Sequence, residues 1–546
     1  MNFLEEKQSQ NILNWYPFNK DEEILEIGFS SNELTKMLCN SVKNVTIIEN
    51  NENTINKINE NLNDFSNLKI LNNLELNGKK YGTILLINIV SRYNDLFKEY
   101  ITLEKLLKNL ENNLNENGKF IIALDNKFGL KYFSGNYENI FNKRFESLYG
   151  YNNENEKIES FTRKKLMNIF DKLGYKYNFY YPLPDYKMPD VIFSDKQLAK
   201  YNTVDKYNLY CPENSITLFN EIDVFREILK TNPEMFTFFT NSFLIELSKN
   251  EIKQKYNFIS FNNIRKEKYQ LITKIADDYV EKQVVSNKAQ KHYDNIKQNI
   301  DILNKLEIKT LDYVEDGIIK SKYINQELML SNVLTQKLED GKLDEFEYIM
   351  SKYIEILNKD SYNIYNYDDT IFAKYDIKIN NNEIIKDLHF LRNGLWDMTF
   401  KNCFYIDNQF YFFDQEWNDA DLPSEYILYR SILYTISLRR YININALFEK
   451  YNLTKYIEIF KKLDDKIQEK IRDENVWEFY NKDNQIDIDA TLNEVNNSHI
   501  REKAKDMAID NLKKQNELLI KENINLKNNK VSNKIKRYVK RIIKKK

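Results

Sequence analysis

The chain has 546 residues, of which 42% are hydrophobic and 30% charged, and it contains 38 Tyr and 33 Phe. This length allows two or three domains, and the apolar content is enough to bury sizeable cores. A formal net charge of −2 excludes a general attraction of the whole molecule for polyanions. The 3 cysteines lie far apart, which argues against a disulfide framework or a zinc site, and with only 3 histidines His-based catalysis is not expected.

Targeting and membrane-spanning segments are not expected from the sequence. No run of about eighteen apolar residues is present, which a membrane-spanning helix would need. The first ten residues, MNFLEEKQSQ, are too polar for a signal peptide. These features predict a cytoplasmic protein. With only 11 glycines in the chain, a complete glycine-rich phosphate loop is not expected either.

Strands and helices alternate in residues 1–250. Strands are predicted at 24–27, 44–49, 83–88 and 119–124, with helical segments between them. Capping-type residues precede the first of these helices. This alternation predicts an α/β fold with a doubly wound parallel sheet, whose ligand crevice lies at the carboxyl ends of the strands.

The arrangement resembles the Rossmann-like fold of class I S-adenosylmethionine-dependent methyltransferases. Glu26 and Gly28 match the first motif of that family, and Glu49 matches the acid that accepts hydrogen bonds from the ribose hydroxyls of the cofactor. The resemblance further implies that Asn73 belongs to the adenine-contacting segment, and that Asn88 ends the fourth strand. It implies S-adenosylmethionine as the cofactor.

The loop after Gly28 departs from the family pattern. The first motif of the family usually carries two or three alternating glycines, whereas Phe29-Ser30-Ser31-Asn32 follow here. Side-chain carbons at these positions hinder the backbone from closing around the methionine part of the cofactor. Two interpretations stay open: a domain that binds S-adenosylmethionine, and a relic that keeps the architecture without the chemistry.

Three further stretches resemble signature segments of a methyltransferase subgroup associated with bacterial surface-polysaccharide synthesis. They are DNKFGLKYF at 125–133, YPLPDYKMP at 181–189 and NSFLIE at 241–246. The second stretch is interpreted as a rigid, aromatic-lined loop suited to a sugar ring, and an ordinary hydrophobic loop is the alternative.

A second pattern runs from Gly394 to Trp417. Asp397 lies five residues before Asn402, and two alternating apolar stretches then flank a turn, which predicts a β-hairpin that ends at Asp414. Phosphoryl transfer from ATP needs a carboxylate that orients the attacking hydroxyl, and an amide and a second carboxylate that hold Mg²⁺ against the phosphates. A polar hairpin in which this spacing occurs by chance is the alternative.

This pattern resembles the catalytic loop and metal-binding Asp of the protein-kinase-like fold, in the form seen in aminoglycoside and choline kinases. Strands predicted at 258–261, 268–275 and 279–282, followed by a helix at 287–306, have the order of a kinase amino-terminal lobe, which predicts an α+β domain. The resemblance covers residues 251–485.

The kinase resemblance implies roles for four residues. Asp397 would be the base or hydroxyl-orienting carboxylate, Asn402 and Asp414 would bind Mg²⁺, and Lys282 would contact the ATP phosphates. A solvated lysine on a short strand is the alternative for Lys282.

Two features depart from the kinase pattern. The first strands are joined by Asn262-Asn263 and not by a glycine-rich loop. The helix after Lys282 also lacks a glutamate that could pair with this lysine, so Asp294 or Asp301 is expected to take that place.

Residues 486–530 have a polar helical pattern. Leu512, Leu519 and Leu526 recur every seven residues, but Asn516 and Asn523 occupy the other seam positions. The pattern predicts a short, imperfect coiled coil, through which the chain could form a homo-oligomer. A single solvated helix is the alternative.

Residues 531–546 form a predicted basic amphipathic helix. Ile535, Tyr538, Val539 and Ile542-Ile543 fall on one face, and Lys and Arg cover the rest. Such a helix lies in the interface of an anionic membrane. Nucleic-acid binding, which we do not expect, and a disordered solubilising end are the alternatives.

The order of these parts resembles the bifunctional enzymes that cap growing O-antigen polysaccharides in bacteria. It implies a transferase at the inner face of the cell membrane, with a glycosyltransferase as a possible partner. Its substrate would be the terminal sugar of a lipid-linked polysaccharide, which it methylates with S-adenosylmethionine, phosphorylates with ATP and Mg²⁺, or both. A catalytically inactive, membrane-tethered scaffold and a methyltransferase alone are the alternatives.

Overall fold

The computed structural model describes residues 3–73, 76, 78–88, 101–151, 158–201, 203–204, 216–379, 383–481 and 485–543. The chain divides into two units. The first comprises residues 1–215 and 220–483, and the second comprises residues 216–219 and 484–546. The predicted boundary at residue 250 lies inside the first unit and, like the other domain boundaries, stays a prediction.

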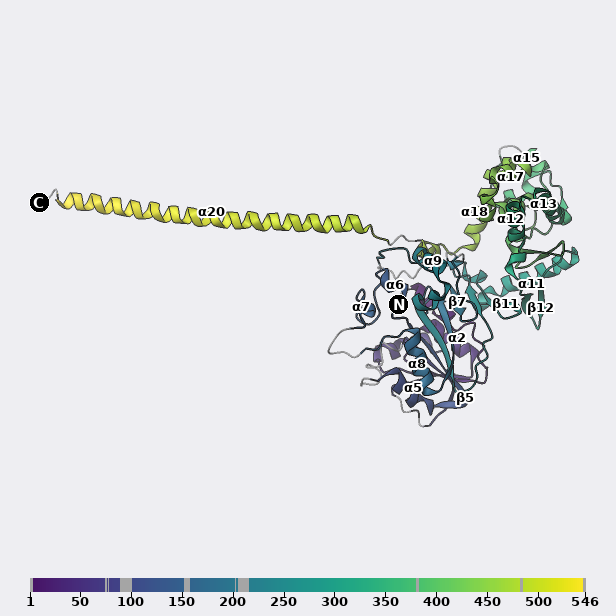
Figure 1. The fold of residues 1–546 in the computed structure, drawn as a ribbon, viewed down its shortest axis with the longest axis horizontal. Helices are drawn as coiled ribbons and strands as arrows, with labels where there is room; N and C mark the ends of the chain where they lie inside the picture. The colour runs from purple at the N-terminus through teal and green to yellow at the C-terminus, as the bar shows by residue number, and fades with distance from the viewer. Residues whose placement is uncertain are drawn as a thin grey trace. The chain divides into compact units, whose positions relative to one another are not determined.

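The amino-terminal half of the first unit is a doubly wound sheet (Figure 1). Its strand order is β3-β2-β1-β4-β5, all parallel, and helices alternate with these strands along the chain. This confirms the predicted Rossmann-like fold for this half. The strands are β1 (Glu23–Ile27), β2 (Asn44–Ile48), β3 (Leu68–Leu71), β4 (Tyr81–Ile87) and β5 (Leu114–Asp125), and the helices are α2 (Asn32–Ser41), α3 (Glu52–Asn61), α5 (Leu103–Glu111) and α8 (Arg163–Leu173).

The sheet continues beyond β5 with antiparallel strands. β8 (Ser242–Ser248) pairs with β5 and with β6 (Lys176–Leu183), and β6 pairs with β7 (Val191–Ser194). The expectation of a loop at 181–189 is therefore wrong for its first three residues, which end β6. Pro182 fits this strand because the pairing of β6 with β8 stops at Tyr180, so its missing N–H lies at an open edge.

The same sheet extends into the second half of the unit. Strand β9 (Phe258–Phe261) pairs antiparallel with β7, in the register Val191↔Ser260 and Phe193↔Phe258. Within the described residues this makes one 13-stranded sheet. The added strands are, in spatial order, β9, β10 (Leu271–Ile275), β11 (Tyr279–Val284), β13 (Ile318–Lys322) and β12 (Asp312–Glu315).

One helix covers this added part of the sheet. α11 (Gln290–Lys305) buries Tyr293, Ile296 and Ile300 in a cluster with Leu271 and Ile319. The three strands and the helix predicted in this region are present. The hairpin β12–β13 had not been predicted.

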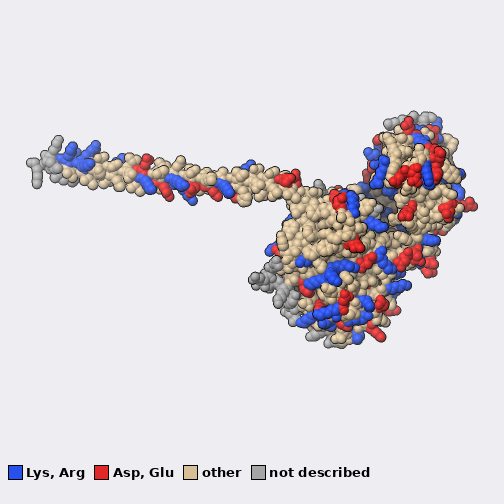
Figure 2. Space-filling view, viewed as in Figure 1, with Lys and Arg blue, Asp and Glu red and all other residues tan. Residues whose placement is uncertain are grey.

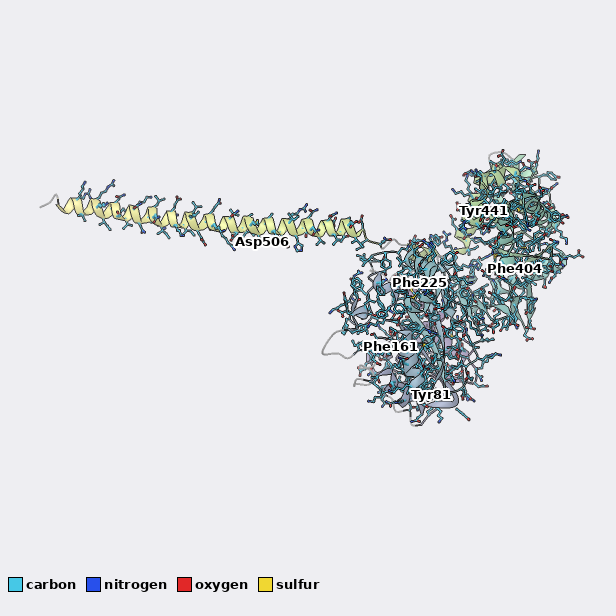
Figure 3. The ribbon with its side chains drawn as sticks, in the orientation of Figure 1. Tyr81, Phe161, Phe225, Phe404, Tyr441 and Asp506 are labelled. Atoms are coloured by element: carbon cyan, nitrogen blue, oxygen red, sulfur yellow. The ribbon has the colours of Figure 1, made fainter. Side chains whose placement is uncertain are left out.

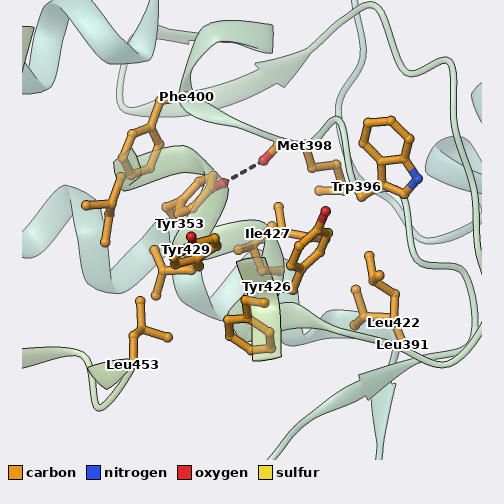
Figure 4. Packing of buried hydrophobic residues seen from close by; sticks show 14 of the residues in the cluster. Tyr353, Leu391, Trp396, Met398, Phe400, Leu422, Tyr426, Ile427, Tyr429 and Leu453 are labelled. Carbon is orange, nitrogen blue, oxygen red and sulfur yellow. Dashed lines mark hydrogen bonds between the residues drawn. The ribbon is translucent and has the colours of Figure 1, made fainter. Parts of the chain in front are cut away.

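A helical region with its own core follows. Tyr353 on α13 (Leu343–Leu357) lies within this core, and its hydroxyl donates to the carbonyl of Met398 at 2.5 Å (Figure 4). This bond fixes the segment directly after Asp397. The main elements are α12 (Leu330–Glu339), α13 (Leu343–Leu357), the hairpin β16 (Cys403–Ile406) and β17 (Gln409–Phe412), α16 (Ser424–Leu433), α17 (Ile444–Lys450), α18 (Ile457–Ile471) and α19 (Glu474–Tyr480).

Shorter elements complete the first unit. The helices are α1 (Phe3–Gln8), α6 (Leu130–Phe133), α7 (Glu146–Tyr149), α9 (Glu221–Thr231), α10 (Phe236–Phe239), α14 (Ile371–Lys374) and α15 (Glu383–Lys386), and the strands are β14 (Ser361–Tyr362), β15 (Phe390–Leu391) and β18 (Leu422–Pro423). Figure 3 shows the side chains of the described residues on the same ribbon.

The second unit is dominated by one uninterrupted helix, α20 (Ile488–Ile543), of 56 residues. Lys and Arg gather at its carboxyl end (Figure 2). Leu512, Leu519 and Leu526 are exposed along it, as are Ile535 and Val539 near its end. The predicted helices are thus present as one, whereas the coiled coil and the membrane contact stay predictions.

The side chains of Tyr538, Ile542 and Ile543 and all of residues 544–546 lie outside the described residues. Among the described residues, no helix combines the length and apolar character that crossing a membrane requires.

Candidate functional site

Asp397, Asn402 and the end of the β16–β17 hairpin are tied together by hydrogen bonds. The Asn402 amide donates to the carbonyl oxygen of Asp397 at 3.1 Å, and the Phe413 N–H donates to the carbonyl of Asn402 at 3.0 Å. Gln415 Nε2 also donates to the Asp397 carbonyl, at 3.0 Å. The backbone carbonyl of Asp397 is therefore fully engaged, while its half-buried carboxylate faces the surface cavity described below.

Lys282 reaches the same place from strand β11. Its ammonium contacts the carboxylates of both Asp414 and Glu416. Burial lowers the pKa of Lys282, but the two carboxylates outweigh this effect and raise the pKa above its ordinary value. The structure thus brings together Lys282, Asp397, Asn402 and Asp414, the four residues that the sequence singled out in this half.

Asp414 is held in an unusual backbone conformation. Its φ is +60°, which Asp tolerates better than most residues, and its N–H donates to Asp312 Oδ2 at 2.7 Å. Burial and the neighbouring Asp414 raise the pKa of Asp312 to about 6. Asp312 belongs to the unpredicted strand β12, and no motif in the sequence marks it as a support for Asp414.

The expectation that Asp294 or Asp301 pairs with Lys282 is wrong. Glu416 takes that place, and Asp294 instead accepts from Gln290 Nε2 at 3.1 Å on the same helix. Helix α11 turns His292 toward Glu416, with Nε2 3.6 Å from the carboxylate. The acid that neutralises Lys282 is therefore Glu416, which lies two residues after Asp414, the predicted Mg²⁺ ligand.

Two more residues in this cluster were missed by sequence reasoning. Arg265, in the loop between β9 and β10, forms an ion pair with Glu416. Asn299 Nδ2 of α11 donates to the Gln415 carbonyl at 3.0 Å. No motif marks either residue, whereas Glu416 could have been found from its position two residues after Asp414.

The electrostatics of Asp397 differ from those of Glu416. Burial raises the pKa of Asp397 to about 7, because the attraction of Arg430 offsets only part of the desolvation and Glu416 and Asp414 add repulsion. Burial also acts on Glu416, but Arg265 and Lys282 hold the pKa of its carboxyl well below the ordinary range. One carboxylate is thus poised to take up a proton near neutral pH, and the other stays ionised.

A cavity of about 180 Å³ opens beside Lys282 and Asp414. Strands β10, β11 and β13 form one wall, and Phe404 and Phe413, whose ring centroids are 5.0 Å apart, form the other. The surface of its lining is mostly apolar, as in binding sites for flat rings. Its charged lining residues are Lys282, Asp312, Lys320, Lys322 and Asp414. The apolar lining residues are Ile275, Val280, Ile319, Ile324, Met329, Phe404 and Phe413.

A larger surface cavity, of about 1100 Å³, opens on the other side of Asp397. Two N–H groups of the buried Arg430 lack a hydrogen-bond acceptor among the described residues, although Nε lies 3.5 Å from Asp464 Oδ1. Every lining residue is polar or charged: Asp397, Thr399, Lys401, Asn402, Arg430, Ser431, Tyr434, Thr435, Asp464, Asp465, Gln468, Glu469, Arg472 and Glu474. Such a lining suits a hydroxyl-rich ligand.

The donor set at Asp414 fits Mg²⁺ only in combination with a substrate. Within the described residues, no group of three or more His, Cys, Asp or Glu side chains could hold a metal ion. Mg²⁺ is commonly bound by one or two protein oxygens together with substrate phosphates. Because the Asn402 nitrogen is used as a donor, its amide oxygen is the atom that can join Asp414 in such a site.

The second group of predicted residues lies in the amino-terminal half, at one edge of the sheet. Gly28, Glu49, Asn73 and Asn88 follow the carboxyl ends of β1, β2, β3 and β4. This is the edge at which doubly wound sheets bind their ligands. Leu74, next to Asn73, lies outside the described residues.

Glu26 and Glu49 shape the loop between β1 and α2. Glu26 is fully buried and accepts from the Ser30 N–H at 2.9 Å, and burial raises its pKa to about 7. Glu49, also fully buried, accepts from the N–H groups of Phe29, Asn50 and Asn51 at 3.3, 3.0 and 3.0 Å. Gly28 needs its freedom here, because its φ is +76°.

The residues that replace the family's glycines leave two polar atoms unsatisfied. Ser30 Oγ and Asn32 Oδ1 are buried without a hydrogen-bond partner among the described residues. Buried polar atoms without partners in the loop after Gly28 fit a polar ligand such as a ribose-bearing cofactor. The N-terminal segment already occupies part of the loop, since the Asn32 N–H donates to Glu6 Oε1 at 2.8 Å.

The three stretches 125–133, 181–189 and 241–246 converge on one buried lysine. The ammonium of Lys131 contacts Asp185 and lies 2.6 Å from Asp125 Oδ1. The backbone N–H of Lys131 donates to Asn241 Oδ1 at 2.8 Å. Asn241 in turn donates to the Pro184 carbonyl at 2.9 Å. The ion cluster of Lys131, Asp125 and Asp185 lies at the carboxyl end of β5, and Asp125 also lines a cavity of about 30 Å³ with Asn88.

The solved structures described here match less than half of this chain. No protein-family model matches the chain, and no curated protein matches it. Among solved structures, a Haloferax volcanii protein described as a methyltransferase, solved with the activator Trm112, is 10% identical, with 46% of this chain and 92% of that chain covered and a TM-score of 0.29.

Two further solved structures have a comparable extent of match. A Listeria monocytogenes protein described as an S-adenosylmethionine-dependent methyltransferase is 11% identical, covers 45% of this chain and 98% of its own, and has a TM-score of 0.27. The YcgJ protein from Bacillus subtilis is 11% identical, covers 45% and 100%, and has a TM-score of 0.26. These values are too low to carry an argument, so the fold assignment rests on the strand order.

The buried Lys131 cluster predicts a large loss of stability on substitution. Lys131 is 1% exposed and Asp185 is fully buried, so Lys131→Met leaves a carboxylate without its counter-ion. We expect the free energy of unfolding of this half to fall by about 3 kcal/mol or more. Urea unfolding followed by circular dichroism measures the shift in midpoint.

The control is Lys172→Met, because Lys172 is exposed and pairs with Glu104 at the surface. Its midpoint should not move, and Lys131→Met combined with Asp185→Asn should recover part of the loss. Equal midpoints for the Lys131 and Lys172 variants would contradict the role of the cluster.

Proposed function

We propose that the carboxy-terminal half of the first unit transfers the γ-phosphoryl group of ATP to a hydroxyl of a glycan. The observation that carries this proposal is the contact of Lys282 with Asp414 at the mouth of an apolar cavity, with Asn402 and Asp397 alongside. Lys282 would hold the phosphates, and Asp414 and Asn402 would hold Mg²⁺, which supplies positive charge against the phosphate oxygens.

In this proposal the acceptor hydroxyl stands next to the Asp397 carboxylate. Its oxygen forms a bond to the γ-phosphorus as the bond from that phosphorus to the β–γ bridging oxygen breaks, and ADP leaves. The proton of the hydroxyl passes to Asp397, whose pKa of about 7 suits a base that works near neutral pH. Lys282 neutralises the charge on the phosphates throughout.

The polar cavity beside Asp397 is the proposed acceptor site. A terminal sugar presents adjacent hydroxyls, which both donate and accept hydrogen bonds. Arg430 offers unpaired N–H donors and Asp464 offers a carboxylate in the same cavity. These groups support a neutral, hydroxyl-rich acceptor, such as the end of a lipid-linked polysaccharide.

For the amino-terminal half we propose methylation with S-adenosylmethionine. Bound cofactor would supply the methyl group: the acceptor oxygen would bond to the methyl carbon as the bond from that carbon to sulfur breaks, S-adenosylhomocysteine would leave, and the proton of the acceptor hydroxyl would pass to solvent. Glu49 would hold the ribose hydroxyls, Ser30 and Asn32 would meet polar groups of the cofactor, and Asn88 and Asp125 would face the acceptor. The convergence of the signature segments on Lys131 supports a formed acceptor region.

The tail and the partners complete the proposal. The basic end of α20 would bind an anionic membrane at its inner face, where lipid-linked acceptors are found. The helix could also pair with a second copy of the chain or recruit a glycosyltransferase. One specific feature favours a second candidate function, a phosphotransferase without methylation: the glycine-free loop Phe29–Asn32, whose Asn32 N–H is already bound to Glu6.

Replacing the proposed base tests phosphoryl transfer directly. Asp397→Asn should lower the transfer of label from γ-labelled ATP to membrane-extracted glycan by about 10²- to 10⁴-fold, because proton removal is lost. Binding of MgATP, measured by calorimetry, should persist, since Asp397 lies on the acceptor side.

The matched control is Asp407→Asn, an exposed turn residue of the same hairpin, whose φ of +49° suits Asn equally well. It should label glycan like the wild type. Equal labelling by the Asp397 variant would contradict the mechanism, and a wild type that binds no MgATP would support the scaffold alternative.

The raised pKa of Asp397 predicts the pH dependence of phosphoryl transfer. A carboxyl whose pKa is about 7 is protonated below that pH and cannot act as a base. The value of kcat/KM should therefore fall as the pH drops through about 7 and level off above it. A profile that stays flat down to pH ~5 would contradict the assignment, and residual activity of Asp397→Asn should lack this limb.

Cofactor binding by the amino-terminal half is tested at Glu49. Calorimetry should detect S-adenosylmethionine binding to the wild type, with affinity reduced about tenfold or more in Glu49→Gln, because charged hydrogen bonds to the ribose are lost. The control is Glu52→Gln, on the exposed start of α3. Absence of binding to the wild type would leave this half as a relic domain.

A further inference from the structure

The loop between β9 and β10, residues 262–270, stands where a kinase-like fold carries its glycine-rich loop, but it contains no glycine. A glycine-rich loop binds phosphates through backbone N–H groups that approach closely because no side chain intervenes. The sequence NNIRKEKYQ cannot do this in the same way. Any contact of this loop with phosphates has to come from side chains.

The loop is fixed at the site by bonds to the end of α18. The Lys266 N–H donates to the Ile471 carbonyl at 2.8 Å, and the Asp473 N–H donates to the Ile264 carbonyl at 2.8 Å. Gln270 Nε2 braces the loop from inside, donating to the carbonyl of Arg265 at 2.7 Å. The backbone on both sides of Arg265 is therefore anchored, and its side chain has a defined position.

The Arg265 side chain points into the acid cluster. Its guanidinium forms an ion pair with Glu416 Oε2, while Lys282 contacts Oε1 of the same carboxylate. The guanidinium carbon also lies 5.5 Å from the centre of the Trp417 ring. Arg265 and Lys282, which come from different elements, thus both contact the Glu416 carboxylate. The side chain of Arg265 remains 27% exposed, so a ligand can reach it.

A triphosphate bound beside Asp414 and Glu416 needs more positive charge than Lys282 alone supplies. Lys282 is shared between Asp414 and Glu416, so part of its positive charge is offset before a nucleotide binds. Phosphates placed beside Asp414 would be repelled unless Mg²⁺ and a second cation compensate. Lys320 and Lys322 line the same cavity as Lys282, whereas Arg265 contacts Glu416 and has a planar guanidinium that can donate two parallel hydrogen bonds to phosphate oxygens.

We infer that Arg265 binds the terminal phosphates of a nucleoside triphosphate and replaces the missing glycine-rich loop. The inference rests on the proposed phosphotransferase function, and it names the phosphate-binding group of the same site. Glu416 holds Arg265 in place before the nucleotide arrives. The nucleotide's ring system enters the apolar cavity, which directs its phosphates past Lys282 toward this loop.

The test compares ligands that share the base but differ in phosphates. The wild type, Arg265→Ala and Arg265→Lys are titrated with MgATP by calorimetry and with adenosine by ligand-observed NMR. Arg265→Ala should bind MgATP about tenfold more weakly or worse, while adenosine binding stays unchanged. Arg265→Lys should fall between the wild type and Arg265→Ala, because it keeps the charge and loses the planar fork.

The matched control is Lys268→Ala, which removes an exposed cation from the same loop, next to Tyr269 and away from Glu416. It should bind MgATP like the wild type. Three results would overturn the inference: unchanged or tighter MgATP binding in Arg265→Ala, an equal loss for adenosine and MgATP, or an equal loss in the Lys268 variant. A wild type that binds neither ligand would instead refute the phosphotransferase function itself.

Discussion

The ammonium of Lys282, buried between two carboxylates, is the interaction on which the second half of this protein depends. Strand β11 supplies the lysine, and the segment after the β16–β17 hairpin supplies Asp414 and Glu416. A charge in this position cannot remain without partners, because desolvation would cost more than the fold can tolerate. The contact therefore joins the strand-rich region to the helical region and also defines the charged end of the apolar cavity.

Asp397 differs from Glu416 because no ion pair to its carboxylate forms among the residues that the structure describes, and Arg430 only partly offsets the effect of burial. Glu416 lies between Arg265 and Lys282, which lower its pKa, so it stays ionised. For Asp397, burial and two nearby acids raise the pKa more than Arg430 lowers it. Such a separation of pKa values is how one site provides both a proton acceptor and a permanent negative charge. The hydrogen bonds to the Asp397 carbonyl leave the carboxylate free for chemistry.

Much of this site could be predicted from local pattern alone. The alternation around the Asp407 turn predicts a hairpin, which is present, and the spacing from Asp397 to Asn402 places both residues beside it. The catalytic role of this loop stays a prediction. The hairpin β12–β13 is also marked in the sequence, because Asp316-Gly317 is a typical turn pair and has φ of +51° and +77°. In the first half, Gly28 and Glu49 mark the ends of adjacent strands, which is enough to place them at one edge of the sheet.

The partners across long distances could not be predicted, because no local signal specifies them. Arg265 meets Glu416 only because the loop between β9 and β10 is anchored to α18, some two hundred residues later. Lys131 likewise finds Asp185 through the packing of β6 and β8. The helix after Lys282 was expected to bring an acid, but the chain places that acid on the hairpin side instead.

The pairing of β7 with β9 has a practical consequence for anyone who wishes to study the two halves one at a time. Backbone hydrogen bonds between β7 and β9 cover strand edges that each half would otherwise expose. Severing the polypeptide near residue 250 would expose both edges at once, and bare strands of this kind adhere to one another. Poor solubility of an isolated half would then be explained by the newly exposed sheet edge and would say nothing about the chemistry of that half.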